Sequence, residues 1–320
     1  MTSQLPATCW VIHDGAAGNR RQAMALAEIL GLPIREWALK ARGLAKLLAP
    51  RKFPGSAAAF GSEFASALRD APPELVIGCG RIAALATRQA STIGARSVQI
   101  LDPRISTSHW DLVIAPEHDG VSGPNVLTMA GSLSPVDAAW LERERQQFPR
   151  LGALARPRTA VLLGGPTRAT RFDRNALEVL LEKLDSWLDR DGGSALICAS
   201  RRTPAQWADP IRDRYRGVNH LVWMDQGDGG NPYSGVLAWA DRIIVSPDSV
   251  NMISEACATA APVFVAEPER ATGRIRKFIQ SLLDRGRVRA QTDEFESFDA
   301  APVDETRRIA ALVRERLSLR

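Results

Sequence analysis

Cysteine is scarce in this sequence, and its four copies are far apart. They are Cys9, Cys79, Cys198 and Cys257, each within or beside an apolar stretch. No CxxC pair and no His/Cys cluster has the spacing of zinc ligands, so the sequence predicts neither a disulfide framework nor a structural metal site. We expect four buried thiols in a reducing compartment, with no bound metal or cofactor.

Long apolar runs are also absent. The amino terminus, MTSQLPATCWVIHDG, has no basic segment followed by an apolar core, and no later window approaches the length that spans a bilayer. We therefore expect a cytoplasmic protein. Hydrophobic residues make up 45% and charged residues 24% of the 320 positions, a composition typical of a globular protein large enough for two cores.

Lysine and tyrosine are rare. Lysine occurs only at positions 40, 46, 52, 183 and 277, so arginine supplies most of the cations behind the net charge of +5. The planar arginine fork suits bidentate binding of phosphate or carboxylate, although a GC-rich genome produces the same bias. With two tyrosines and no aromatic–basic platform, the sequence does not indicate a nucleic-acid partner.

Apolar strand patterns and helix patterns alternate along the whole chain. We expect strands at residues 8–12, 33–37, 75–78, 97–101, 112–115 and 125–129, then at 159–163, 195–199, 220–223, 243–245 and 263–266. We expect helices at residues 19–30, 81–93, 135–148, 174–189, 204–215, 250–259, 273–285 and 303–318. This alternation predicts an α/β protein with two Rossmann-like doubly wound domains facing a cleft.

The segment LGALARPR, at residues 151–158, is the best candidate for a linker between the two domains, because it combines glycine, proline and small residues. We expect residues 1–152 to form the first domain and residues 153–300 the second. The last helix, within residues 301–320, can return to pack on the first domain.

Residues 243–265 form the most informative stretch, because a short apolar strand leads through a hydroxyl-rich turn into a helix. Ser246, Asp248 and Ser249 are candidates to cap that helix. A helix N-terminus at the carboxyl end of a strand favours an anion, through its free N–H groups and its dipole. Glu255 lies further along the same apolar helix. It is either an acceptor for sugar hydroxyls or an ordinary solvated glutamate.

Two glycine-containing turns follow the first strand of each domain. HDGAAGN carries Gly15 and Gly18 but lacks the GxGxxG spacing of a dinucleotide fold, so it predicts only a generic ligand-facing turn. The second turn follows the strand AVLL, and its residues of interest are Gly164, Gly165, Thr167 and Arg168. Glycines there can admit a pyrophosphate, with Thr167 and Arg168 as donors, although a plain strand-ending turn explains the glycines almost as well.

Arginines recur at the carboxyl ends of expected strands. Ser200, Arg201 and Arg202 follow the strand ALICA, Arg81 follows LVIGCG, and Arg104 follows VQILDP. In a parallel sheet these ends lie at one edge, so the same edge of both domains collects basic residues. We therefore expect an anionic small-molecule ligand.

The candidates for acid–base chemistry are less distinctive. His13 and Asp14 follow the first strand, and His118 follows the strand DLVIAP; each can act near neutral pH, but a hydrogen-bonded histidine or a turn-capping aspartate explains them as well. Asn231 is placed to cap a short helix that contains Tyr233. Tyr233 can stack on a base or pack in the core.

Residues 36–53, EWALKARGLAKLLAPRKF, mix leucines with basic residues. Such a composition can lie on an anionic bilayer, and it then indicates a location peripheral to the inner membrane. Alternatively, the leucines pack on the domain's own sheet.

Six short motifs resemble one known family. They are GCGR at 78–81, PEHD at 116–119, GGPT at 164–167, SRRTP at 200–204, NPY at 231–233 and PDSVNMISEA at 247–256. Together they resemble the mitochondrial fission ELM family, and nearly the whole chain takes part. The family is similar to GT-B proteins, which have two Rossmann-like domains, and among them to the lipid-linked glycosyltransferase of peptidoglycan synthesis.

The resemblance implies a bacterial member of the family whose second domain binds a nucleotide-diphosphate sugar. Glu255 then accepts the ribose hydroxyls, and Gly164, Gly165 and Ser249 face the pyrophosphate with the two adjacent arginines nearby. The implied activity is metal-independent glycosyl transfer. The alternatives are a nucleotide-sugar 2-epimerase or hydrolase, and a non-catalytic protein like the plant members, which are fission factors that recruit a dynamin-related protein. The first glycine turn is shorter than the acceptor loop of the peptidoglycan enzyme, and a second catalytic carboxylate is not evident.

Overall fold

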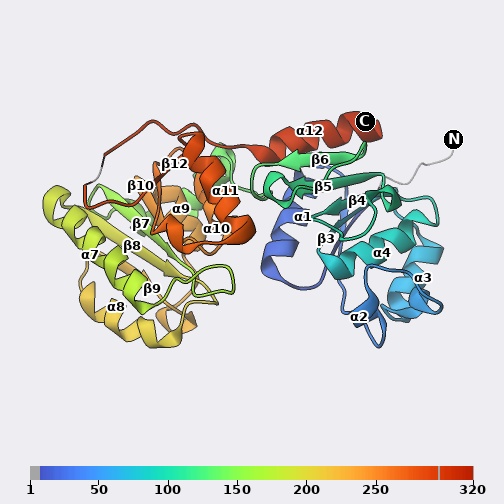
Figure 1. Cartoon of the computed structure of the whole chain (residues 1–320), viewed down its shortest axis with the longest axis horizontal. Helices are drawn as coiled ribbons and strands as arrows, with labels where there is room; N and C mark the ends of the chain where they lie inside the picture. The colour runs from blue at the N-terminus through green and yellow to red at the C-terminus, as the bar shows by residue number, and fades with distance from the viewer. Residues whose placement is uncertain (1–7, 295, 320) are drawn as a thin grey trace. The chain divides into compact units, whose positions relative to one another are not determined.

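The structure is a computed structural model that describes residues 8–294 and 296–319. By internal contacts the chain divides into two compact units. The first holds the chain up to Pro135 together with everything from Asp304 onward, and the second is Val136–Val303 (Figure 1). Each unit is a parallel sheet with helices on both faces, as the alternating sequence pattern predicts.

The six strands of the first unit form one parallel sheet in the order β2-β1-β3-β4-β5-β6. They are β1 (Cys9–His13), β2 (Ile34–Ala38), β3 (Leu75–Cys79), β4 (Arg96–Ile100), β5 (Leu112–Pro116) and β6 (Val126–Met129). The helices are α1 (Ala17–Leu30), α2 (Ala45–Leu48), α3 (Ser62–Asp70), α4 (Arg81–Ser91) and α12 (Glu305–Leu317), with the 3-10 turns η1 (Ser56–Ala58), η2 (Thr107–His109) and η3 (Glu117–Asp119).

Both faces of this sheet are buried. In β1, Cys9 and Val11 pack with α1 and α12, whereas Trp10 and Ile12 pack with α3 and α4. Successive side chains of a strand point to opposite faces, so a strand covered on both sides carries apolar residues throughout. This is why β1 is CWVIH, with every residue buried.

The second unit repeats the arrangement with the strand order β12-β11-β10-β7-β8-β9, again all parallel. Its strands are β7 (Arg158–Leu163), β8 (Ser194–Ala199), β9 (Leu221–Trp223), β10 (Arg242–Val245), β11 (Val263–Val265) and β12 (Val288–Ala290). The helices are α5 (Ala138–Gln147), α6 (Pro149–Gly152), α7 (Arg174–Asp191), α8 (Ala208–Arg214), α9 (Tyr233–Trp239), α10 (Val250–Cys257) and α11 (Gly273–Asp284), with the 3-10 turns η4 (Ala205–Trp207), η5 (Gln226–Asp228) and η6 (Pro268–Arg270).

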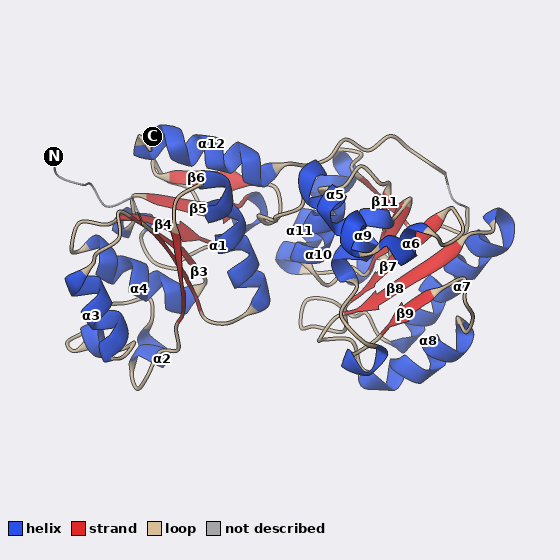
Figure 2. Ribbon diagram, turned by 180° about the vertical axis from the view of Figure 1, so that it is seen from behind, coloured by secondary structure: helices blue, strands red, loops and turns tan. Residues whose placement is uncertain are grey.

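The two faces of the second sheet are also buried, as the same alternation in β7 illustrates. Ala160 and Leu162 pack with α9, α10 and α11, whereas Val161 and Leu163 pack with α7 and α8. Figure 2 shows the strands of this sheet between the two helix layers. A core on each face rigidly fixes the strand ends, from which the polar loops emerge.

Each sheet has one point where the strand order reverses. In the first sheet it lies between β1 and β3, and in the second between β7 and β10. Ligands of open parallel sheets bind outside the carboxyl ends of the strands at such a point. The loops that follow these strands carry residues 14–16 and 80 in the first unit, and residues 164–168 and 246–249 in the second.

The division by contacts differs from the boundary expected at residues 152 and 153, because it falls between Pro135 and Val136. The helices α5 and α6 pack on α9 of the second sheet, so they belong with it although they precede β7. The last helix, α12, packs on α1 and β6 of the first unit. Arg314 of α12 donates to the carbonyls of Ile29 and Leu30 at the end of α1.

Some elements depart from the sequence-based expectation. Gly18 lies inside α1, which begins at Ala17, rather than in the turn before it. Within residues 36–53 only Ala45–Leu48 is helical. The helix α3 and the edge strand β12 were not expected. Among the residues that the structure describes, no helix has the length and apolar character needed to cross a membrane.

Candidate functional site

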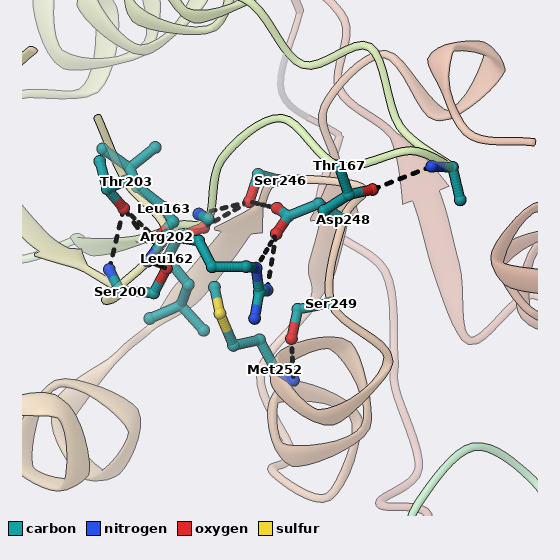
Figure 3. A network of polar contacts seen from close by, with 12 residues as sticks. Leu162, Leu163, Thr167, Ser200, Arg202, Thr203, Ser246, Asp248, Ser249 and Met252 are labelled. Carbon is teal, nitrogen blue, oxygen red and sulfur yellow. Dashed lines mark hydrogen bonds and ion pairs between the residues drawn. The ribbon is translucent and has the colours of Figure 1, made fainter. Parts of the chain in front are cut away.

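The point where the second sheet reverses is occupied by a network of polar contacts between β7 and β10 (Figure 3). The Ser246 hydroxyl accepts a hydrogen bond from the Gly164 N–H at 2.7 Å and donates to the Asp248 carboxylate at 2.6 Å. Arg202 reaches the other Asp248 oxygen from the loop after β8, with an N–O distance of 2.7 Å. The network ties together the ends of three neighbouring strands.

The two glycines after β7 are required by this network. A Cβ atom on Gly164 would overlap the Asp248 carboxylate, and one on Gly165 would overlap the Arg202 carbonyl. The absence of side chains therefore makes room for the protein's own groups. This packing role accounts for both glycines without a ligand.

The loop after β8 is fixed to the end of β7. Thr203 donates through its hydroxyl to the Leu163 carbonyl at 2.9 Å, and the Ser200 N–H donates to the same carbonyl at 2.8 Å. These bonds hold the SRRTP turn rigidly. They direct one of its two arginines, Arg202, to Asp248, while the side chain of Arg201 is exposed.

The loop after β7 is anchored on its far side by the loop after β11. The Thr272 N–H donates to the Ala169 carbonyl at 2.7 Å, and the Arg171 N–H donates to the Arg270 carbonyl at 3.1 Å. The residue between these anchors and the glycines, Arg168, is exposed. Arg168 and Arg201 are thus two exposed cations on anchored loops, one after each of two adjacent strands, β7 and β8.

The helix α10 begins at this edge, as expected. Ser249 is its N-cap, and the Ser249 hydroxyl accepts from the Met252 N–H at 3.4 Å. Of the three expected capping residues, Ser246 and Asp248 instead take part in the network around Gly164. The first N–H groups of a helix have no partner within it, so the start of α10 presents donors and positive potential.

Glu255 lies in α10 with only 3% of its surface exposed. Its carboxylate accepts a hydrogen bond from the Tyr233 hydroxyl, at the start of α9. A side chain on a helix leans toward the N-terminus, so this carboxylate is directed toward the end of the helix at which Ser249 lies. Burying a carboxylate is costly unless donors surround it, and Glu255 is not a solvated surface glutamate.

Asn231 and Tyr233 are linked at the start of α9. The Asn231 side-chain oxygen accepts from the Tyr233 N–H at 2.9 Å, which is the capping role expected for it. Tyr233 is half-buried and packs against the core beneath α9 and α10. Its ring belongs to the core, while its hydroxyl serves Glu255.

In the first unit, His13 is buried and fully engaged. Its Nδ1 accepts from the Gly15 N–H at 3.0 Å, and its Nε2 lies 2.9 Å from a Glu36 oxygen. A histidine that accepts at Nδ1 and donates from Nε2 is neutral. Arg20 also binds Glu36, and its hydrogen bond is the main cause that lowers the pKa of Glu36 to about 2.

The other acid–base candidates do not join His13 in one place. The Asp14 carboxylate accepts from the Ala16 N–H and from the Asn19 amide, both at 3.0 Å, which is the turn-capping role. His118 lies after β5, with its Nε2 3.9 Å from Asp119. In the sheet β3 and β4 separate β5 from β1, which at about 4.8 Å per strand is roughly 14 Å.

Arg81 also has a structural role. Its guanidinium donates to the carbonyls of Lys46, Leu47 and Ala49 at 2.8 to 3.1 Å. It therefore secures the segment around α2 from the start of α4. Arg104, the other expected cation of this edge, is exposed and has a positive φ of 57°, and its N–H donates to Asp102.

All four cysteines are buried, as expected. Burial raises the pKa of the Cys9 and Cys198 thiols to about 12 and that of Cys79 and Cys257 well above its ordinary value, so none is a nucleophile at neutral pH. Within residues 8–294 and 296–319 there is no group of three or more His, Cys, Asp or Glu side chains that could hold a metal ion.

The sequence is matched from residue 17 to residue 317 by a family model described as mitochondrial fission ELM1. The chain belongs to the mitochondrial fission ELM1 family. This confirms the resemblance inferred from the six motifs. All of the site residues of the second unit lie within the matched range.

This ELM1-family chain covers different shares of two relatives that its sequence matches. It is 31% identical to the mitochondrial fission protein ELM1 of Arabidopsis thaliana over 278 residues, which cover 78% of this chain and 65% of the plant protein. It is 24% identical to an uncharacterized protein of Rickettsia prowazekii, over 97% of this chain and 98% of that protein. The bacterial relative is thus matched almost end to end.

Solved structures with a similar fold include one named for nucleotide-sugar chemistry and one solved with UDP. The UDP-GlcNAc 2-epimerase of Methanocaldococcus jannaschii has a TM-score of 0.57 at 12% identity, over 96% of this chain and 99% of that one. Os79 from O. sativa, in complex with UDP, has a TM-score of 0.55 at 14% identity, over 96% and 91%. With the two parallel sheets, this likeness confirms the predicted GT-B-like fold class; that the two domains face a cleft stays a prediction.

Several residues of the site were not expected to have the role that the structure gives them. Thr203, Asn19 and Glu36 each fix a loop at a strand end. Thr203 lies in the SRRTP motif, whereas no local motif distinguishes Asn19 or Glu36. Ser246 was expected as a cap and is the centre of the network instead. The hydroxyl two residues before Asp248, directly after a buried strand, was the one available signal.

Proposed function

We propose that the second unit binds a nucleoside diphosphate sugar outside the carboxyl ends of β7 and β10. The position follows the rule for open parallel sheets, because the strand order reverses between these two strands. The loops there are held by backbone and side-chain bonds, so a ligand would meet a preorganised surface rather than order it on binding.

Glu255 is the observation that carries the proposal. It is a buried carboxylate and the one charged residue of α10, a helix that begins at the strand reversal. A carboxylate has about four acceptor sites, so it can accept from the ribose hydroxyls of a ligand while Tyr233 also donates to it. Two hydroxyls on adjacent carbons match the two oxygens of one carboxylate.

The diphosphate would lie between the start of α10 and the exposed arginines. Helix N-terminal N–H groups and guanidinium forks both bind phosphate oxygens. Arg202 is paired with Asp248, so Arg201 and Arg168 are the cations to which we assign the ligand's charge. Thr167, in the loop after β7, and Ser249, in the loop after β10, would contribute hydroxyls.

For the base we propose uracil. Os79 was solved with UDP, and the UDP-GlcNAc 2-epimerase of Neisseria meningitidis, with a TM-score of 0.53 at 13% identity over 97% of this chain and 99% of that one, was solved with UDP-GlcNAc. The proposed reaction is transfer of the sugar to an acceptor hydroxyl. The acceptor oxygen bonds to the anomeric carbon and its proton passes to solvent, while the bond from that carbon to the diphosphate breaks with the electron pair left on the UDP oxygen. The start of α10 and the arginines stabilise the departing diphosphate.

A thermal-shift screen tests the binding proposal. Because a ligand of the native state raises the apparent melting temperature, UDP and UDP-GlcNAc should each raise it, and ADP and GDP should raise it less. The shift should disappear in Glu255→Ala and stay in Lys277→Gln, a matched exposed position of α11. No shift with any nucleoside diphosphate would overturn the proposal.

A second candidate function rests on the family. The Arabidopsis relative is named as a mitochondrial fission protein, so a non-catalytic protein that binds a protein partner is the alternative to transfer. Incubation with a UDP-sugar separates the three possibilities. A transferase releases UDP only when an acceptor is present, an epimerase or hydrolase changes the sugar without one, and an interaction protein leaves the UDP-sugar unchanged.

A further inference from the structure

The first unit carries an exposed apolar surface on and beside α2. Leu44, Leu47 and Leu48 have 62%, 75% and 39% of their surface exposed. Isolated exposed leucines are common, but three within five consecutive residues form a contiguous patch. We call residues 40–53 the α2 segment. Figures 1 and 2 both draw α2 at the margin of the first unit, beyond α4.

Basic residues surround these leucines. Lys40, Arg42, Lys46, Arg51 and Lys52 are all exposed. No aspartate or glutamate occurs between Glu36 and Glu63. The segment therefore presents five cations and no anion along with its apolar side chains.

The segment is held firmly with its leucines outward. Ala45 and Ala49 pack inward against Leu85 of α4. Arg81 donates to three carbonyls of the segment, and Arg88 donates to the Pro50 carbonyl at 2.6 Å. The two alanines of the segment are buried and its three leucines are exposed. The leucines therefore do not belong to the hydrophobic core of this unit.

A further positive charge, that of Arg88 on α4, acts on the segment. The pKa of Lys52 is lowered, first by partial burial and then by the positive charge of Arg88. The pKa of His109, on η2, is lowered by partial burial and by Arg88 and Lys52. The positive charge of Arg88 on α4 therefore adds to the field of the segment.

We propose that the α2 segment docks the protein on the surface of a bilayer rich in anionic phospholipid. Leucines enter the boundary between headgroups and acyl chains, and the surrounding lysines and arginines bind the phosphates. Charge complementarity favours this partner, because the five cations are attracted to anionic headgroups and gain no such attraction from an uncharged surface. The inference stands independently of the proposed nucleotide-sugar site, since it uses no residue of the second unit.

The experiment is co-sedimentation of the full chain with vesicles. The expected result is binding to vesicles of phosphatidylcholine with about one-third phosphatidylglycerol, and loss of binding to pure phosphatidylcholine. Binding should also fall when the salt is raised from 0.1 M to 0.5 M, since the Debye length shortens from about 10 Å to about 4 Å.

Two sets of variants test the two parts of the segment. Arg42→Gln with Lys46→Gln removes two cations and should weaken partition about 25-fold, at about fivefold per charge. Leu44→Ser with Leu47→Ser removes the apolar contact and should weaken it at least as much. The matched controls lie on the second unit: Arg174→Gln with Lys277→Gln for charge, and Val218→Ser, with 93% of its surface exposed, for apolar exposure.

All of these side chains are exposed, so the variants should fold with unchanged melting temperatures. Equal binding to anionic and neutral vesicles would overturn the proposal. So would a charge control that weakens binding as much as the segment variant, because net charge alone would then explain it. Absence of vesicle binding by the wild-type chain would refute the proposal.

Discussion

The reversal points of the two sheets share a topology and differ in what their polar residues do. In the first unit the candidate groups are bound by neighbouring residues: His13 is held by Gly15 and Glu36, and Asp14 by Asn19. In the second unit the network around Asp248 is equally closed. Around that network, however, Arg168 and Arg201 are exposed and α10 presents its N-terminus.

Some polar residues at the strand ends hold the protein's own backbone, and others are exposed where a ligand could bind. Arginines occur at the same edge in both units, yet Arg81 is committed to three backbone carbonyls, whereas Arg201 extends from a fixed turn into solvent. An arginine at the carboxyl ends of the strands is therefore not necessarily available to a ligand. The second unit combines exposed cations on anchored loops with a buried carboxylate, Glu255, on α10.

The largest expected effect is on the stability of the second unit. Gly164→Ala should destabilise it by about 3 kcal/mol, because the added methyl displaces the Asp248 carboxylate from Ser246. Gly15→Ala in the first unit should cost only about 1 kcal/mol, since Gly15 has a positive φ but open space around it. Calorimetric unfolding measures both; equal effects would contradict the distinction between the two glycine turns.

The next effect compares the arginines of the two edges. Arg201→Ala should weaken nucleoside diphosphate binding about tenfold, through loss of a charge-assisted contact with phosphate. Arg81→Ala should leave the affinity unchanged and lower the melting temperature, because three carbonyls of the α2 segment lose their donor. Titration calorimetry of both variants checks this prediction. A loss of affinity in Arg81→Ala alone would place the ligand on the first unit and contradict the proposed site.

Tyr233 allows a smaller test within the second unit. Tyr233→Phe keeps the ring but removes the donor to Glu255, so it should destabilise the protein by about 1 kcal/mol. Its affinity for UDP should stay within about threefold of the wild type, because the carboxylate remains. If the affinity falls as far as in Glu255→Ala, the hydroxyl itself contacts the ligand, and our assignment of the ring to the core needs revision.

The smallest effect is a pH dependence that both units share. The pKa of Glu36 is lowered to about 2 chiefly by Arg20, and that of Asp191 to about 2 chiefly by Arg190, from ordinary values of 4.5 and 3.8. A lowered folded-state pKa stabilises the folded protein above the unfolded-state value, and the contribution is lost as pH falls through about 2. Because both pairs are largely exposed, solvent screens them and we expect a small contribution from each.

Melting curves between pH 5 and pH 2 test this dependence. Glu36→Gln and Asp191→Asn should each flatten the loss of stability over that range. A variant whose melting temperature falls with pH as steeply as the wild type would mean that the corresponding ion pair does not contribute.

Much of the fold is predictable from the sequence because the buried strands are largely apolar. β1 and β8 are found readily for this reason. β12, of sequence VRA, was missed, because two of its three residues are exposed and it exists by pairing with β11 at an edge. The helix α5 was expected with the first domain because it precedes the linker, whereas its packing on α9 groups it by contacts with the second sheet.

The candidate site was predictable only in part. Glu255 and Ser249 stand out locally, as a carboxylate in an apolar helix and a serine before it. The partners of Gly164 and Gly165 could not be predicted, because Asp248 and Arg202 reach them across the sheet from distant parts of the chain. The same reason hides the role of Arg81, whose acceptors lie on the α2 segment.

The most direct test of the central claim is titration calorimetry of the wild type and Glu255→Ala with UDP. The account predicts saturable binding by the wild type and an affinity at least tenfold lower in the variant, as expected when a charged hydrogen-bond partner is removed. Equal affinity of the two proteins would show that Glu255 is a structural carboxylate, and absence of binding by the wild type would show that the second unit is not a nucleotide-sugar site.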